Sequence, residues 1–165
     1  MNPGVKVPAN IQALTGITNE MVASAPAAAV VMREVAEFVE DFPLVAHNAA
    51  FDRRFWDAEL ARVKRTRRQE FACSMLIARR LLPHAPSHKL GELAAFAQLP
   101  ATGRFHRALA DAEMAAHLLG HMTKLLRRDH NIREVDHDLW CGIQRTPTAA
   151  LPAFLADRRE RGPAA

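Results

Sequence analysis

The chain has 165 residues, of which 49% are hydrophobic and 24% charged, and its formal net charge is +4. This length suits one ordinary domain, and this balance excludes a disordered chain. The longest apolar stretch, residues 25–32, is far shorter than the roughly 20 residues that a membrane helix needs, so we expect no membrane partner. Two cysteines are too few for a disulfide framework and fit a reducing, cytoplasmic setting.

A first helix is predicted to run from about residue 27 to residue 41. Ser24 and Pro26 form a helix-start signal, and the apolar residues that follow recur at helical spacing. Residues 42–47 then form a short, continuously apolar run that is rich in strand-forming residues. Such a run predicts a parallel strand that is buried on both faces.

A second helix is predicted over residues 51–63, because Phe51, Phe55 and Leu60 fall on one face and charged residues fall on the other. The helix ends in a basic run, residues 62–68. This run could contact phosphate groups, but we interpret it as a solvated helix end.

One further strand and several helices are predicted downstream. They are a strand at residues 71–73, a helix over residues 75–82, a helix capped by Ser87, and a long helix over residues 107–127. The apolar stripe of the long helix consists of Leu109, Met114, Leu118, Leu119 and Met122. We expect residues 1–128 to form the main domain, and residues 129–165 to form a tail of loop with one short helix.

The alternation of helices and strands predicts an α/β domain. Two strands, however, cannot form a sheet that covers so many helices, so we expect further strands to come from outside this sequence.

The segment from His47 to Asp52 lies where the first predicted strand gives way to a helix, which is the edge of an α/β sheet where ligands usually bind. Asp52 falls in the first helical turn, and the positive end of the helix dipole keeps a carboxylate there ionised and able to hold a metal ion. Taken alone, an acidic residue at this position is more often only a favourable first-turn residue.

A second segment of interest, from His106 to Asp111, enters the long predicted helix. Five residues of an ideal helix turn through about 500°, so the two side chains can converge only if His106 lies in the loop before the helix. Gly103 and its polar neighbours favour such a loop. On this spacing alone, a surface loop histidine is an equally good interpretation.

Together the two segments resemble the second and third motifs of the DnaQ-like, DEDDh-type 3′ to 5′ exonuclease family, which includes the epsilon subunit of DNA polymerase III. They read His-Asn-Ala-x-Phe-Asp over residues 47–52 and His-Arg-Ala-Leu-x-Asp-Ala over residues 106–112. A Leu-Thr-Gly-Ile-Thr segment at residues 14–18 and the pair Lys89-Leu90 add to the likeness, which spans roughly residues 3–125.

The resemblance implies an RNase H-like fold that hydrolyses nucleic acid, expected to be DNA, from a single-stranded 3′ end, with a DNA polymerase as a candidate partner. It also implies two divalent cations, Mg²⁺ or Mn²⁺, which can generate the nucleophile and stabilise the leaving oxygen. By the family pattern, Asp111 would bind metal directly, Asp52 would act chiefly through metal-bound water, and His106 would be the general base. The candidate substrate-binding residues are His47, Asn48 and Phe51.

The first motif of the family, Asp-x-Glu on the first strand, has no counterpart on a predicted strand. Asp-x-Glu occurs at residues 57–59 and 111–113, but both lie in predicted helices, where side chains two apart point to nearly opposite sides and cannot clasp one metal ion. We therefore expect an RNase H-like exonuclease fold that lacks its first three strands and is inactive in this form. Either the natural protein is longer, which we favour, or the chain is a remnant that does not catalyse.

A rival hypothesis is a non-catalytic module on the same fold that binds nucleic acid or associates with a polymerase. In either case the strand near Leu44 would lack the neighbouring strand at the centre of the sheet. The unpaired apolar edge would then invite self-association.

Overall fold

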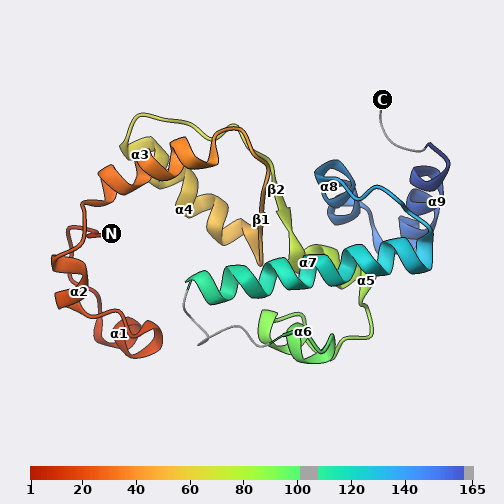
Figure 1. Cartoon of the computed structure of the whole chain (residues 1–165), viewed down its shortest axis with the longest axis horizontal. Helices are drawn as coiled ribbons and strands as arrows, with labels where there is room; N and C mark the ends of the chain where they lie inside the picture. Colours follow the sequence, from red (N-terminus) through yellow and green to blue (C-terminus); the bar gives the residue numbers. More distant parts are fainter. Residues whose placement is uncertain (101–107, 162–165) are drawn as a thin grey trace. The chain divides into compact units, whose positions relative to one another are not determined.

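The structure is a computed structural model that describes residues 1–100 and 108–161 (Figure 1). The elements are α1 (Ala9–Thr15), α2 (Asn19–Ala23), α3 (Ala28–Val39), β1 (Leu44–Ala46), α4 (Ala49–Arg62), β2 (Phe71–Cys73), α5 (Ser74–Leu81), α6 (Leu90–Phe96), α7 (Ala108–His130), α8 (His137–Arg145), a short 3-10 helix (Thr148–Ala150) and α9 (Leu151–Arg161). They form two compact units. The first unit is Met1–Phe42 with Phe51–Gln69, and the second unit is Pro43–Ala50 with Glu70–Ala165.

The two strands lie where the sequence predicts them and pair in parallel, with Leu44 opposite Phe71 and Ala46 opposite Cys73. The predicted burial of β1 on both faces is wrong. Val45 is 36% exposed, and the other two residues of β1 are half-buried. In the part of the chain that the structure describes, β1 pairs with β2 alone, so its second edge has no neighbouring strand there.

The outer edge of β2 is closed by a side chain instead of a strand. Gln144 of α8 accepts a hydrogen bond from the Cys73 backbone N–H (2.6 Å), and its amide group donates one to the Phe71 carbonyl oxygen (3.1 Å). Gln144 thereby satisfies a backbone donor and a backbone acceptor that a third strand would otherwise pair. In the described residues, β2 is therefore the last strand on this side of the sheet.

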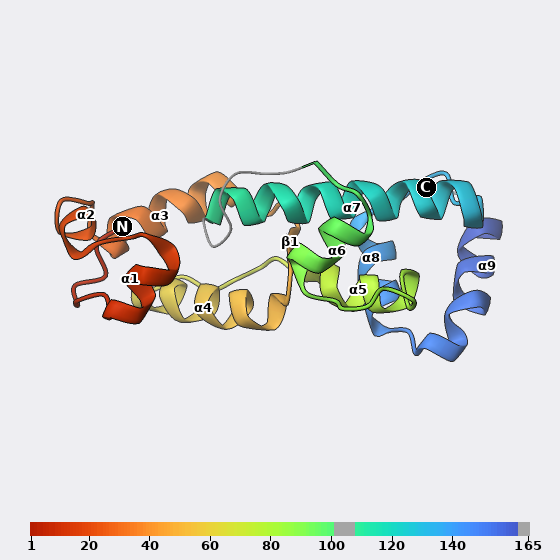
Figure 2. The same ribbon diagram turned by 90° about the horizontal axis from the view of Figure 1, so that it is seen from below.

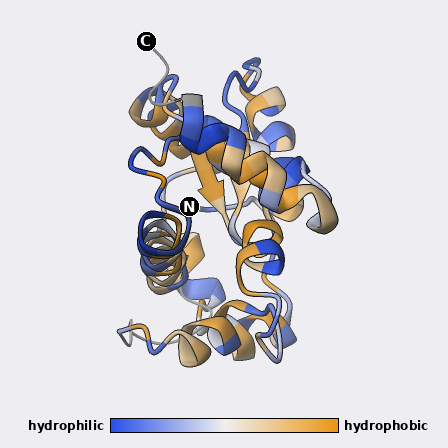
Figure 3. Ribbon diagram, turned by 90° about the vertical axis from the view of Figure 1, so that its right-hand side faces the viewer, coloured by the Kyte–Doolittle hydropathy of each residue, from blue (hydrophilic) through white to orange (hydrophobic). Residues whose placement is uncertain are grey.

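The core of the second unit forms where five helices pack around β2. Both α5 and α6 pack against α7, and they lie beside it in two perpendicular views (Figures 1 and 2). The side chains that are fully buried in this core include Ile77, Leu93, Leu118, Met122, Leu139, Ile143 and Leu155. In the hydropathy colouring (Figure 3), the helices carry both hydrophobic and hydrophilic residues, as helices with one face in a core do.

The long helix α7 agrees with the prediction, and Met114, Leu118 and Met122 of its apolar stripe are buried. Leu109 was expected on the same stripe but is 73% exposed. It lies in the first turn of α7, outside the buried cluster of the second unit.

The tail differs from the expected loop with one short helix, because it contains both α8 and α9. Asp136 caps α8 by accepting a hydrogen bond from the Leu139 N–H (2.7 Å), and it forms an ion pair with Arg158 of α9 (3.0 Å). Leu139 and Trp140 are buried in the core of the second unit. The tail therefore packs with α5, α6 and α7 in one compact unit.

In the first unit, α3 and α4 lie where the sequence predicts helices, and α1 and α2 precede them in a segment for which no element was predicted. A small apolar cluster forms here from Met32, Leu60 and Val63, with Ala36 and Trp56 packed against it. Phe51 and Phe55 were expected on the buried face of α4, but they are 65% and 49% exposed. The cluster covers only the later turns of α4, so the first turns leave their aromatic side chains uncovered.

None of the helices in the two described ranges has both the length and the apolar character that crossing a membrane requires.

Candidate functional site

Both predicted metal-binding carboxylates occupy the first turn of a helix. Asp52 is exposed in the first turn of α4, and Asp111 is half-buried in the first turn of α7. These helix positions agree with the sequence analysis. Asp52 belongs to the first compact unit and Asp111 to the second. The predicted general base, His106, lies outside the described residues.

The metal ligands in the two described ranges do not form a complete site for a pair of divalent cations. No three His, Cys, Asp or Glu side chains of these ranges come together as a group that could hold a metal ion. The pairs Asp57/Glu59 and Asp111/Glu113 both lie in helices, as predicted, so neither pair can clasp one ion. Asp57 and Glu59 are also engaged by Arg67 (2.7 Å) and Arg62 (2.9 Å).

His47 is held at both of its ring nitrogens. Nε2 lies 2.9 Å from the carbonyl oxygen of His88, which can only accept, so Nε2 donates this bond. Nδ1 lies 3.0 Å from Oγ of the fully buried Ser74 and can accept from that hydroxyl. Oγ of Ser74 is also 3.4 Å from the Ala46 carbonyl oxygen. His47 therefore ties the end of β1 to the start of α5 and to the loop before α6.

Asn48, the next residue, has a φ of 64°, a left-handed conformation that asparagine adopts more readily than most residues. Together with His47 it lines a cavity of about 450 Å³ in the second unit. The other residues that line this cavity are Met75, Arg79, Ser87, His88, Lys89 and Leu90. Two of the three candidate substrate-binding residues thus share one cavity, whereas Phe51 does not line it. Their role in substrate binding stays a prediction.

Ser87 does not cap α6, contrary to the prediction. Lys89 occupies the N-cap position of α6, without a capping bond from its side chain. The Ser87 hydroxyl instead accepts a hydrogen bond from the Lys89 backbone N–H (3.3 Å) within the loop. The helix starts later than predicted because this local turn takes up the serine side chain.

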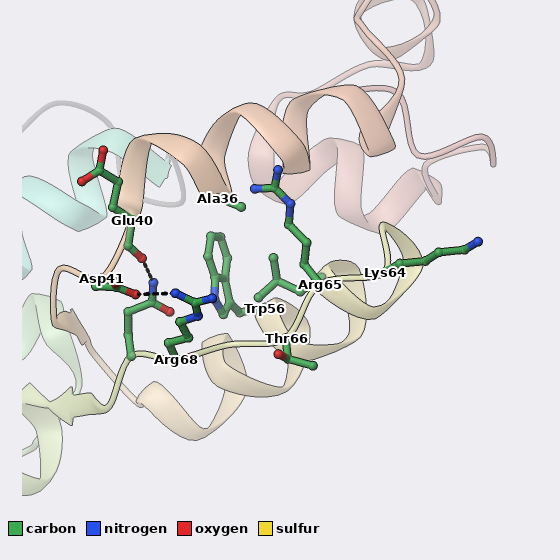
Figure 4. A pocket seen from close by; sticks show the side chains of 10 residues that line it. Ala36, Glu40, Asp41, Trp56, Lys64, Arg65, Thr66 and Arg68 are labelled. Carbon is green, nitrogen blue, oxygen red and sulfur yellow. Dashed lines mark hydrogen bonds and ion pairs between the residues drawn. The ribbon is translucent and has the colours of Figure 1, made fainter.

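A larger cavity, of about 600 Å³, lies within the first unit beside the Trp56 indole (Figure 4). Its wall includes two carboxylates, and Arg68 forms an ion pair with one of them, Asp41 (3.8 Å). Arg65, also in its wall, forms an ion pair with Glu37 (2.9 Å). Most cations of the basic run at residues 62–68 are therefore paired within the protein. This pairing agrees with a solvated helix end and not with a phosphate-binding surface.

Cys141 and His137 are the residue types of a nucleophile and its base, and Sγ lies 3.3 Å from Nε2. However, Cys141 is fully buried, and this burial, helped by the Glu70 carboxylate, raises the pKa of its thiol to about 11. A thiol with such a pKa stays protonated at neutral pH. Cys141 is therefore part of the core and not a reactive nucleophile.

The Exonuclease (RNase_T) family matches residues 1–119 of the chain. This match covers well over half of the sequence, and the chain belongs to this RNase T/DnaQ-like exonuclease family. The predicted family is thereby confirmed.

Several curated proteins share this region. A Mycobacterium tuberculosis protein named as a bifunctional exonuclease/endonuclease is 41% identical over 122 residues, which are 72% of this chain and 19% of that protein. The PolC-type DNA polymerase III of Bacillus subtilis is 35% identical over 126 residues, 74% of this chain and 9% of the polymerase. The PolC-type enzyme of Listeria monocytogenes is 34% identical over 133 residues, 80% of this chain and 9% of the polymerase. The chain thus spans less than a fifth of the length of these relatives.

Among solved structures, the chain is similar to Exonuclease X in complex with 5′ overhanging duplex DNA. The TM-score is 0.63 at 27% sequence identity, and the match covers 87% of this chain and 78% of that one. Exonuclease X has an RNase H-like fold, so the predicted fold class is confirmed. In the described residues this fold is rich in helices, and its sheet has two parallel strands.

Proposed function

We propose that this chain is part of a metal-dependent 3′ to 5′ exonuclease domain that removes nucleotides from single-stranded 3′ ends of DNA. Membership of the exonuclease family and the likeness to an exonuclease in complex with DNA support this proposal. The observation that carries it is the position of Asp52 and Asp111. Each lies in the first turn of a helix, in a segment that matches one of the family motifs.

In this proposal Asp52 and Asp111 are carboxylate ligands for Mg²⁺ or Mn²⁺, ions that stabilise negative charge on a phosphodiester. His106 takes a proton from the attacking water, a task that suits histidine because its ordinary pKa lies near neutral pH. Hydrolysis breaks the bond between phosphorus and the 3′ oxygen of the preceding nucleotide. The product is a nucleoside 5′-monophosphate.

We expect the 165-residue chain to be inactive by itself, because its only Asp-x-Glu pairs lie on helices. The same observation favours the alternative function, a non-catalytic module that binds nucleic acid or associates with a polymerase. The PolC-type relatives are DNA polymerases by name, which supports a polymerase as the partner. Two buried free cysteines support a place in the reducing cytoplasm.

The first test is to read the codons upstream of Met1 and to assay hydrolysis of a 3′-labelled single-stranded DNA with Mg²⁺. We expect the 165-residue chain to release no more label than a control with EDTA. A chain extended by an in-frame strand bearing Asp-x-Glu should release nucleotides. In that extended chain, His106→Ala and Asp111→Asn should each lower the rate by about 100-fold or more.

Asp138→Asn is the matched control, because Asp138 is an exposed carboxylate on α8 outside the proposed site. It should leave the rate unchanged. If the His106 and Asp111 variants degrade DNA as fast as the parent, the assigned roles are wrong. An in-frame stop codon close to Met1 would instead support the non-catalytic alternative.

A further inference from the structure

We propose that the cavity of the second unit binds a phosphate group of the nucleic-acid strand, through Asn48, Arg79, Ser87 and Lys89. This inference rests on the proposed function, since it assigns part of the substrate to a place on the protein. The cavity, of about 450 Å³, is large enough for part of a nucleotide. Arginine, lysine, serine and asparagine are side chains with which proteins commonly hold nucleic-acid phosphates.

The charge of the cavity separates it from the larger cavity of the first unit. None of its lining residues is a carboxylate, and two of them, Arg79 and Lys89, are exposed cations. Neither cation forms an ion pair with any residue in the described ranges. In the larger cavity, by contrast, Glu40 and Asp41 share the wall with the cations. The wall of the cavity of the second unit therefore carries two cations and no carboxylate, which favours an anion.

Arg79 differs in the same way from its neighbour Arg80. The Arg80 guanidinium donates hydrogen bonds to the carbonyl oxygens of Thr146 (2.6 Å) and Leu76 (2.8 Å). Arg80 thus holds the end of α5 against the chain that follows α8. Arg79, in the same helical turn, makes no such bond within the described residues and lines the cavity instead.

The position of Lys89 is not explained by local structure. Lys89 is the N-cap residue of α6, where the positive end of the helix dipole disfavours a cation. Its side chain makes no capping bond there. An anion bound in the cavity would favour a cation at this position, because Lys89 and Arg79 both line the cavity.

The loop that carries these groups is fixed before any ligand binds. The His88 carbonyl oxygen accepts from the His47 ring, and the His88 ring donates from Nε2 to the Leu82 carbonyl oxygen (3.2 Å). The Ser87 hydroxyl already accepts from the Lys89 N–H, and its own hydrogen has no acceptor among the described residues. That hydrogen can be donated to a phosphate oxygen. Such preorganisation lowers the entropy that binding costs.

The test uses the 165-residue chain, a fluorescent single-stranded DNA and EDTA, so that binding is measured by anisotropy without hydrolysis. We expect Arg79→Gln and Lys89→Gln each to weaken binding roughly three- to tenfold at low salt. Each should also reduce the slope of log affinity against log salt by about 0.7, as expected for one lost contact to a single strand. Arg79→Lys should recover much of the affinity.

Lys124→Gln is the matched control, because Lys124 is an exposed cation on α7 that does not line the cavity. If the two cavity variants bind no worse than this control, or if the parent chain does not bind DNA at low salt, the inference is overturned. A second arm uses deoxyadenosine 5′-monophosphate as competitor. Two results together would overturn the assignment of the cavity to a phosphate of the DNA strand. These are full competition by the mononucleotide, and a slope of log DNA affinity against log salt that does not change in the variants. They would assign the cavity to free nucleotides instead.

The two proposals fail separately. Loss of DNA binding in the cavity variants, together with an extended chain that hydrolyses no DNA, would keep the phosphate site and remove the exonuclease function. If the extended chain hydrolyses DNA but the cavity variants bind DNA like the control, the exonuclease function would be kept and the phosphate site removed.

Discussion

The His47 imidazole bonds to partners from two separate segments of the second unit, the start of α5 and the loop before α6. If alanine replaces His47, the His88 carbonyl oxygen loses its donor, and the buried Ser74 hydroxyl keeps only its longer contact with Ala46. A buried polar group without its partner costs about 1–3 kcal/mol. We therefore expect His47→Ala to lower the free energy of unfolding by about that amount in urea denaturation.

The control for this prediction is His84→Ala. His84 is exposed in the same loop, so its removal should change the free energy of unfolding by less than about 0.5 kcal/mol. Equal stability of the His47 variant and the parent would show that the two ring contacts do not hold β1, α5 and the loop together. A fall in DNA affinity without any loss of stability would instead assign His47 to direct contact with the substrate.

At the level of elements, the Gln144 side chain pairs with the outer edge of β2, where the described sheet ends. Gln144→Ala would leave the buried Cys73 backbone N–H without an acceptor and open the outer edge of β2. We expect a loss of about 1–3 kcal/mol in the free energy of unfolding. Gln144→Glu should be intermediate, because a carboxylate can still accept from the Cys73 N–H but cannot donate to the Phe71 carbonyl oxygen.

Arg145→Ala provides the comparison for this pair of variants. Arg145 is the next residue of α8 and forms an ion pair with Glu70 (2.6 Å) in which both side chains are more than half exposed. Such a pair contributes at most about 1 kcal/mol. If Gln144→Ala costs no more than Arg145→Ala, the amide does not act as a substitute strand.

Local signals explain which elements could be predicted from the sequence. The apolar spacing of α3, α4 and α7 lies within each segment, so their positions follow from the sequence alone. The sequence carries such signals for α8 as well, since Asp136 stands at the N-cap and Leu139, Trp140 and Ile143 fall at helical spacing. The exposure of Phe51 and Val45 could not be predicted, because burial depends on which elements pack against them.

For the whole molecule, the two motif segments could be found because each is continuous in the sequence. The cavity of the second unit could not, since its residues come from the end of β1, from α5 and from the loop before α6. Arg79 carried no local signal that distinguished it from Arg80. Only the long-range bond from Arg80 to Thr146 shows which of the two arginines is structural.

The 165-residue chain should self-associate, because the described residues leave apolar groups and a strand edge uncovered. Phe38 is 86% exposed and Phe42 67%, and β1 has one unpaired edge in the described sheet. Uncovered edges and apolar side chains favour pairing with another copy. We expect size-exclusion chromatography to show oligomers or aggregates whose share grows with concentration.

Val45→Lys on β1 and Phe38→Ser on α3 should each increase the monomer fraction, since a charge blocks strand addition and a hydroxyl reduces apolar area. Phe96→Ser, at an exposed position of α6, is the control for a general gain in solubility. A parent chain that elutes as a monomer and unfolds cooperatively would contradict the prediction, because the β1 edge and the exposed phenylalanines would then need no partner.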